Sequence, residues 1–235
     1  KKTDEADAEW IMLMHSYGLL KPSFHPDADA RSIRELARHR DNMLRSAGKE
    51  IQHMQKSLVL MNIKVDTVIS DILGKSGKAI IEAILSGNHD SRSLAQLADF
   101  RCKASKETIE KSLEGTWNVV HLFELKQSYD LYKYIHTQIA DCESEMDRLL
   151  SNYTDGCDID MQNYTPTKKR VAKKNAISFD AEKHAFSMWG VNAMEMPGMS
   201  LGALAVLMGE LGSGFAEKFT SAKSFCKWCN LVPNN

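Results

Sequence analysis

Apolar residues recur at alternating intervals of three and four positions from Ile33 onward, with only Arg40 out of pattern. Repeated over several heptads, this spacing is typical of a coiled-coil seam rather than of an ordinary amphipathic helix. Because Gly74 provides a helix stop, the pattern predicts one long helix that continues to about residue 72. The seam positions are Ile33, Ala37, Leu44, Ala47, Ile51, Met54, Leu58, Met61, Val65, Val68 and Ile72.

The same spacing returns after residue 120 and predicts a second long helix. Its seam carries Leu122, Leu125, Tyr129, Tyr132, His136 and Ile139 and continues less regularly to Met146 and Leu149. Two long helices joined by shorter ones favour either an antiparallel hairpin or a dimer arm, with His136 as a packed seam residue rather than a ligand. The alternation typical of strands is nearly absent, and 19–24 is the best candidate, so a mainly α fold is expected.

Composition places the chain among globular proteins and leaves any polyanion binding to local patches. Its 235 residues are 43% hydrophobic and 26% charged, and the net charge is -1. Five scattered cysteines favour free thiols in a reducing compartment, so a cytoplasmic location is expected. No apolar run approaches the roughly 20 residues of a membrane span, so no membrane partner is expected.

Two groups of basic residues are candidate nucleic-acid contacts. Beside the first seam, a line of polar and basic residues without an acid fits either a solvated face or a surface that follows a phosphate backbone. A polar, turn-rich segment after Leu150 holds a second basic run, which fits either solubilising charge or a nucleic-acid clamp. The line is Arg31, Arg34, Arg38, Asn42, Arg45, Lys49, Gln52 and Lys56, and the run is Lys168, Lys169, Arg170, Lys173 and Lys174.

Near the end of the chain, MPGMSLGALAVLMGELG places Pro197 and Gly198 in a predicted tight turn, with Ser200 as the N-cap of a helix. This turn and helix resemble the hairpin of a helix-hairpin-helix motif, in which backbone N–H groups hold a DNA phosphate. Pro-Gly turns also precede ordinary structural helices. Cys226 and Cys229 lack a second pair of zinc ligands, so they are expected to be packing thiols.

The opening KTDEADA contains two aspartates on one helical face, Asp4 and Asp7. One interpretation is ordinary helix chemistry, in which Thr3 or Asp4 caps a helix from about residue 5 to residue 17 and acids occupy its first turn. The other interpretation is half of a divalent-metal site.

Five segments in order resemble one family: KTDEADA, ARSIRELARHR, DILGKSGKAIIEAILSG, MPGMSLGALAVLMGELG and FCKWCNLVPNN. They are similar to the DEDD transposases of bacterial insertion sequences, the RuvC-like recombinases guided by a bridge RNA, whose relatives include pilin-gene invertases. The resemblance covers essentially the whole chain. It implies DNA transposition or site-specific recombination by metal-dependent phosphoryl transfer, with Mg²⁺ or Mn²⁺ as cofactor. The implied partners are donor and target DNA, a guide RNA, and further copies of the chain in a dimer or tetramer.

By this resemblance Asp4 and Asp7 are the last two of four metal-binding acids in an RNase H-like domain. The other two acids are expected before Lys1 and the family's serine nucleophile after Asn235, so the chain is expected to be an internal portion of a longer recombinase. The implied divisions are 1–28 as the end of the RuvC-like α/β domain, 29–153 as a coiled-coil region, 154–183 as a polar linker and 184–235 as the start of a helical transposase domain. The competing hypothesis is a non-enzymatic helical scaffold for nucleic-acid binding or oligomerisation.

Overall fold

The computed structural model describes residues 3–20, 22–167 and 174–231, and these residues are mainly helical, as predicted. Within them there is no strand. The α-helices are α1 (Asp4–Ser16), α2 (Ala28–Leu60), α3 (Lys75–Leu85), α4 (Ser91–Gln96), α5 (Lys106–Ser112), α6 (Val119–Asp155), α7 (Ala181–Trp189), α8 (Leu201–Leu211), α9 (Phe215–Lys218) and α10 (Ala222–Trp228), with short 3₁₀ turns at Val65–Thr67, Met161–Asn163 and Ala193–Glu195.

The described part of 19–24 forms no strand, so that prediction is wrong. A strand requires a neighbour to accept and donate its backbone hydrogen bonds, and the described chain offers none. Phe24 instead packs into an aromatic cluster, with ring centroids 5.3 Å from Phe219 and 5.4 Å from Trp228.

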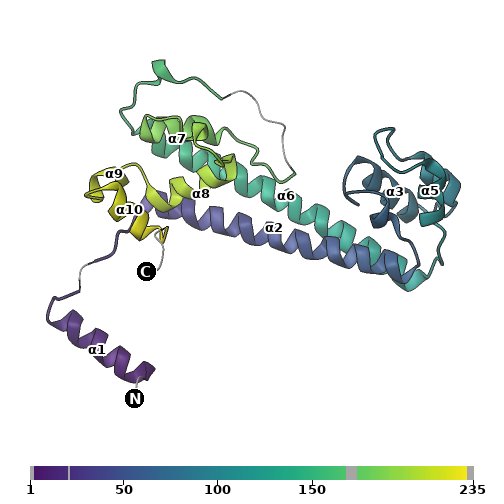
Figure 1. The fold of residues 1–235 in the computed structure, drawn as a ribbon, viewed down its shortest axis with the longest axis horizontal. Helices are drawn as coiled ribbons and strands as arrows, with labels where there is room; N and C mark the ends of the chain where they lie inside the picture. Colours follow the sequence, from purple (N-terminus) through teal and green to yellow (C-terminus); the bar gives the residue numbers. More distant parts are fainter. Residues whose placement is uncertain (1–2, 21, 168–173, 232–235) are drawn as a thin grey trace.

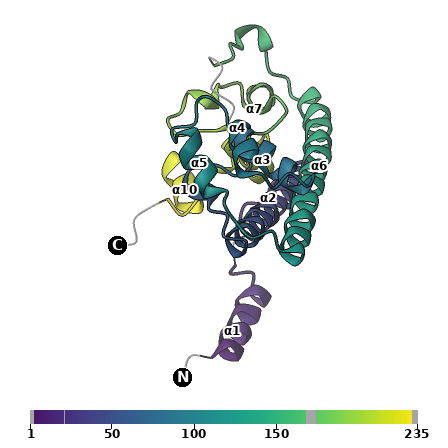
Figure 2. The same ribbon diagram turned by 90° about the vertical axis from the view of Figure 1, so that its right-hand side faces the viewer.

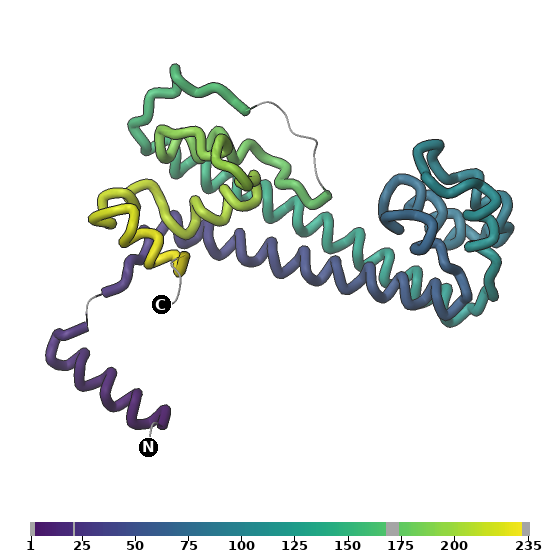
Figure 3. The backbone as a smooth tube through the Cα atoms, viewed as in Figure 1, coloured from purple at the N-terminus to yellow at the C-terminus, as the bar shows by residue number. Residues whose placement is uncertain are grey.

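The two long helices, α2 and α6, lie side by side and antiparallel (Figures 1 and 3). The start of α2 meets the end of α6, because the Tyr153 hydroxyl donates to the Asp27 carboxylate. Further along, the Cys142 thiol lies 3.5 Å from the Leu36 carbonyl oxygen. Of the two arrangements left open by the sequence, the chain itself forms the antiparallel hairpin.

Helix α2 ends at Leu60, so the prediction of a helix to about residue 72 is wrong. Asn62 adopts the left-handed conformation with a φ of 61°. The N–H of Ile63 donates to Leu58 O at 2.9 Å and the N–H of Asn62 donates to Val59 O at 2.9 Å. These two bonds form a Schellman motif, which ends a helix, and Asn tolerates the required conformation better than most residues.

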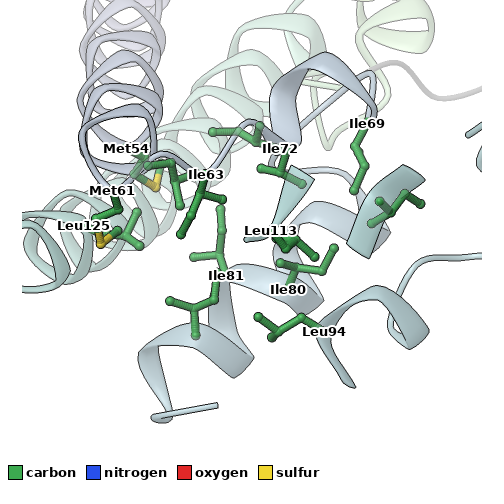
Figure 4. Packing of buried hydrophobic residues seen from close by; sticks show 14 of the residues in the cluster. Met54, Met61, Ile63, Ile69, Ile72, Ile80, Ile81, Leu94, Leu113 and Leu125 are labelled. Carbon is green, nitrogen blue, oxygen red and sulfur yellow. The ribbon is translucent and has the colours of Figure 1, made fainter. Parts of the chain in front are cut away.

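Beyond this stop, helices α3, α4 and α5 form a head at the far end of the hairpin (Figure 1). Its core is continuous with the ends of α2 and α6, and Figure 4 shows Met61 and Leu125 beside Ile63 at the junction. Each fully buried aliphatic side chain stabilises the fold by about 1.5–3 kcal/mol, so the head is firmly joined to the hairpin. The largest fully buried side chains here are Met54, Leu58, Met61, Ile63, Ile80, Ile81, Ile84, Leu94, Ile109, Leu113 and Leu125.

A second core lies at the opposite end, where α7 and α8 pack on the hairpin. Gly209 permits the close approach of α8, because a Cβ there would lie 2.6 Å from the Cα of Arg34. Ile177 and Phe179, from the segment predicted as a polar linker, are buried in this core.

The interruption of the first seam at Arg40 has a structural reason. The Arg40 side chain is only 10% exposed, and its Nε donates to Glu143 Oε1 of α6 at 2.5 Å. A second guanidinium nitrogen donates to Asn175 O at 2.8 Å, and Glu143 Oε2 accepts from the N–H of Ser178 at 3.0 Å. This buried pair therefore joins α2, α6 and the segment that leads into α7.

Candidate functional site

Helix α1 carries the two candidate metal ligands, Asp4 and Asp7. Of the two caps that the sequence left open, Thr3 is the one that caps the helix, because its hydroxyl oxygen accepts from the N–H of Ala6 at 3.3 Å. Both carboxylates are exposed in the first turn. Oxygen ligands of this kind suit Mg²⁺ or Mn²⁺. Among the described residues no group of three or more acids, histidines or cysteines gathers, so the pair fits the metal chemically but supplies only part of a coordination sphere.

The rest of α1 is also uncovered. Helix α1 lies apart from the other helices in Figures 1 and 2, and it buries none of its side chains. Trp10 is 61% exposed and Met12 is 63% exposed, and Tyr17, which directly follows the helix, is 70% exposed.

The basic line on α2 is not free of acids in space, and the interpretation of an acid-free line is therefore wrong. Glu210 of α8 accepts a hydrogen bond from Arg38 at 2.7 Å and lies 3.7 Å from the guanidinium of Arg34. Asp41, one turn before Arg45, pairs with it at 2.5 Å. The docking of α8 thus neutralises part of the line.

Three cations of the line keep an exposed charge. Arg31, Lys49 and Lys56 are exposed, and no ion pair within the described ranges involves any of them. Of the second basic run, Lys168, Lys169, Arg170 and Lys173 lie outside the described residues. The remaining member, Lys174, donates to the Asp71 carboxylate at 2.8 Å and 3.0 Å.

The predicted turn before α8 is present. The N–H of Met199 donates to Met196 O at 3.2 Å, and Gly198 has a φ of 84°, which is the geometry of a type II turn. Ser200 caps α8, as predicted, by accepting from the N–H of Ala203 at 3.2 Å.

The turn borders a groove of about 670 Å³ between α8 and α2. Gly198, Ser200 and Gly202 form one side, and Arg40 and Asp41 lie on the other. The first N–H groups of α8 have no acceptor within the helix and give the groove a partial positive charge. Asp41 opposes this charge, and Arg40 is already paired with Glu143.

Two further predictions concern single side-chain types. His136 is half-buried with its ring centroid 4.4 Å from that of Tyr132, and burial lowers the pKa of the imidazole, which agrees with a packed seam residue. Cys226 and Cys229 are half-buried on and just after α10, and burial raises the pKa of the Cys229 thiol.

Sequence reasoning missed Glu210 and the partner of Arg40. The only signal for the first was Gly209, since a glycine inside a helix often marks a close approach of another backbone. No local signal linked Arg40 to Glu143, because they lie 103 positions apart.

Protein-family models, curated proteins and solved structures were compared with the chain, and none of them matches it. No helix in the described parts combines the length and the apolar character needed to cross a bilayer.

Proposed function

We propose that this chain takes part in DNA transposition or site-specific recombination as a DEDD-type, RuvC-like recombinase guided by a bridge RNA. The observation that carries the proposal is the order of the five family-like segments along the sequence. The first lies on α1, the second on α2, and the third leads into α3. The fourth forms the turn and α8, and the fifth begins in α10.

In this proposal Asp4 and Asp7 are ligands of Mg²⁺ or Mn²⁺. Their spacing presents both carboxylates on one face of the first turn, where mutual repulsion favours a bound cation. The metal supplies stabilisation of the attacking and leaving oxygens in phosphoryl transfer. The resemblance also implies a serine nucleophile that attacks the DNA phosphate.

Nucleic-acid contact is assigned to the exposed cations at the start and middle of α2. Arg31 and Lys49 are the strongest candidates, because Arg34, Arg38 and Arg45 already have acidic partners. Backbone N–H groups beside Gly198 and Ser200 are a second candidate, for one phosphate. Lys168, Lys169 and Arg170 are proposed as further nucleic-acid contacts. The proposed partners are donor and target DNA, a guide RNA, and further copies of the chain in a dimer or tetramer. The proposed location is the bacterial cytoplasm.

The alternative function is a non-enzymatic scaffold that binds nucleic acid or oligomerises through the long hairpin. The observation that favours it is the hairpin itself, since α2 and α6 form a rod with exposed cations along one helix.

The test uses the protein expressed from its complete reading frame, with guide RNA and labelled DNA that carries the ends of its element. If the protein is a recombinase, DNA strands should be cleaved in Mg²⁺ and not in EDTA, because phosphoryl transfer requires the metal. If it is a scaffold, DNA and RNA should bind equally well in both buffers and no strand should be cleaved. Binding without cleavage would overturn the proposed function.

A further inference from the structure

One carboxylate of α8 is shared by two arginines of α2. Helix α8 packs on the first half of α2 (Figure 1). Arg38 Nη2 donates to Glu210 Oε1 at 2.7 Å, and Arg34 Nη1 lies 3.7 Å from Glu210 Oε2. The two oxygens of a single carboxylate therefore lie against the basic line, one beside each guanidinium group.

The guanidinium group of Arg34 is poorly satisfied by this arrangement. Its 3.7 Å contact with Glu210 is too long for a hydrogen bond, and so is its 3.8 Å contact with Glu35. Its Nε is buried and has no hydrogen-bond partner among the described residues. Because a buried charged donor without a partner costs free energy, Arg34 would gain from a better acceptor.

A phosphodiester group can replace the carboxylate on both arginines. Like a carboxylate, it carries one negative charge and presents two terminal oxygens, and arginine binds either group through paired N–H donors. The tetrahedral phosphorus spreads these oxygens further apart than a planar carboxylate does. A phosphodiester therefore suits two guanidinium groups that one carboxylate does not bond at the same time.

Only the side chain of Glu210 has to move for this exchange. The backbone of α8 is fixed on α2, because Gly209 lies against the backbone of Arg34 and Met208 is fully buried. Glu210, by contrast, is the penultimate residue of α8, and its side chain is 26% exposed. Rotation about its side-chain bonds takes the carboxylate into solvent while the helix stays in place.

The neighbouring Arg31 favours a ligand with repeated phosphates. Arg31, Arg34 and Arg38 are spaced by three and four positions, so they follow one face of α2. Arg31 is exposed and the side chain of Arg38 is 58% exposed, so both can meet a ligand from solvent. A single free phosphate would contact only the Glu210 end of this line, whereas successive phosphates of a nucleic-acid backbone can contact both ends.

We propose that Glu210 is an autoinhibitory carboxylate, which occupies the arginines Arg34 and Arg38 until a phosphate of a nucleic-acid backbone displaces it. The inference rests on the nucleic-acid contact of the proposed function and adds to it a competitor within the chain. A ligand already held at other cations gains enough from the two arginines to displace Glu210, whereas an isolated phosphate does not. The carboxylate therefore selects against weak, non-productive contacts.

The test is the affinity of the full chain for a short fluorescein-labelled DNA duplex of arbitrary sequence, measured by fluorescence anisotropy at about 50–200 mM salt. Glu210→Gln removes the competing charge and keeps the shape of the side chain. It should raise the affinity about twofold to fivefold, as expected for the release of one partly exposed ion pair. The salt dependence should steepen by about one unit of slope for each arginine that gains a phosphate.

Two controls separate this exchange from a general change of charge. Glu35→Gln removes the same charge beside Arg34, but Glu35 is 69% exposed and accepts no hydrogen bond within the described part of the chain, so affinity and slope should change much less. In an Arg38→Gln background, the gain from Glu210→Gln should largely disappear, because the exposed half of the site is gone. Glu210→Asp, which keeps the charge on a shorter side chain, should give an intermediate gain. Circular dichroism checks that each variant is folded.

Equal affinity and slope for wild type and Glu210→Gln would overturn the inference and leave Glu210 as a structural partner of the two arginines. An equal gain from Glu35→Gln, or a full gain without Arg38, would overturn it as well. Saturable binding of inorganic phosphate to Glu210→Gln, measured by calorimetry, would contradict the assignment to a nucleic-acid backbone. If no variant binds DNA, the nucleic-acid contact of the proposed function fails too, so the two failures are distinguishable.

Discussion

Replacing Arg40 by methionine should be among the most destabilising single changes on the hairpin. The methionine fills most of the space of the arginine stem but leaves the Glu143 carboxylate, only 5% exposed, without its counter-charge. Glu143 would then keep only the bond from the N–H of Ser178, and Asn175 O would lose its donor.

The size of the effect follows from the burial of the pair. Removing one partner of a buried ion pair costs about 3–5 kcal/mol, chiefly because the other charge stays buried alone. Changing both residues, Arg40→Met with Glu143→Leu, removes that charge and should cost less, about 1–3 kcal/mol for the unpaired N–H of Ser178. The matched control is Arg148→Met, which breaks an exposed, solvent-screened pair with Glu145 and should change the stability little.

Native-state hydrogen exchange of the α2 and α6 amides is the suitable assay, because the chain has two separate cores that can open independently. In the Arg40→Met variant, amides near Arg40 and Glu143 should lose about 3–5 kcal/mol of protection against exchange, which is the cost of breaking a buried ion pair. Amides of the head should be unaffected. A single variant that costs no more than the Arg148→Met control, or a double variant that costs more than the single one, would refute the reasoning.

Three further predictions concern binding, the turn and acid stability. Arg31→Gln with Lys49→Gln should flatten the salt dependence of nucleic-acid binding by about one unit of slope per lost phosphate contact. The control is Lys218→Gln, at an exposed lysine of α9, which should leave the salt dependence unchanged. Gly198→Val should destabilise the chain by about 1–2 kcal/mol in thermal unfolding, because the φ of Gly198 is positive. Gly198→Asn should destabilise it less, since Asn tolerates this conformation better. A loss of DNA binding in the stable Asn variant would then indicate a phosphate contact at the turn. The hydrogen bond from Arg101 holds the pKa of Asp99 well below its usual range. The stabilisation of the folded head by ionised Asp99 is therefore present above about pH 4 and is lost as the pH falls through the folded-state pKa. Asp99→Asn should remove this acid dependence of head unfolding.

The elements that the sequence predicted well are those governed by local chemistry. The cap at Thr3, the long helix α6 and the Ser200 cap follow from residues within a few positions of one another. The end of α2 was missed because the heptad pattern continued past it while Asn62 ended the helix through its own backbone conformation.

The part of the candidate site that sequence could not give depends on contacts between distant elements. Glu210 meets Arg38 from 172 positions away, so no spacing rule on α2 could reveal that part of its basic line is neutralised. The exposure of Asp4 and Asp7 also depends on packing between elements, because α1 buries none of its side chains.

Strand cleavage by the complete protein carrying Asp7→Ala, measured in Mg²⁺ beside Glu5→Ala, tests the central claim most directly. Glu5 is an exposed acid in the same helical turn but on a different face, so it controls for charge and for helix stability. If Asp7 binds the metal, Asp7→Ala should lower cleavage at least about a hundredfold while Glu5→Ala stays close to wild type, with folding and RNA binding unchanged in both. Wild-type cleavage by Asp7→Ala would contradict the account and leave Asp4 and Asp7 as acids in the first turn of a capped helix.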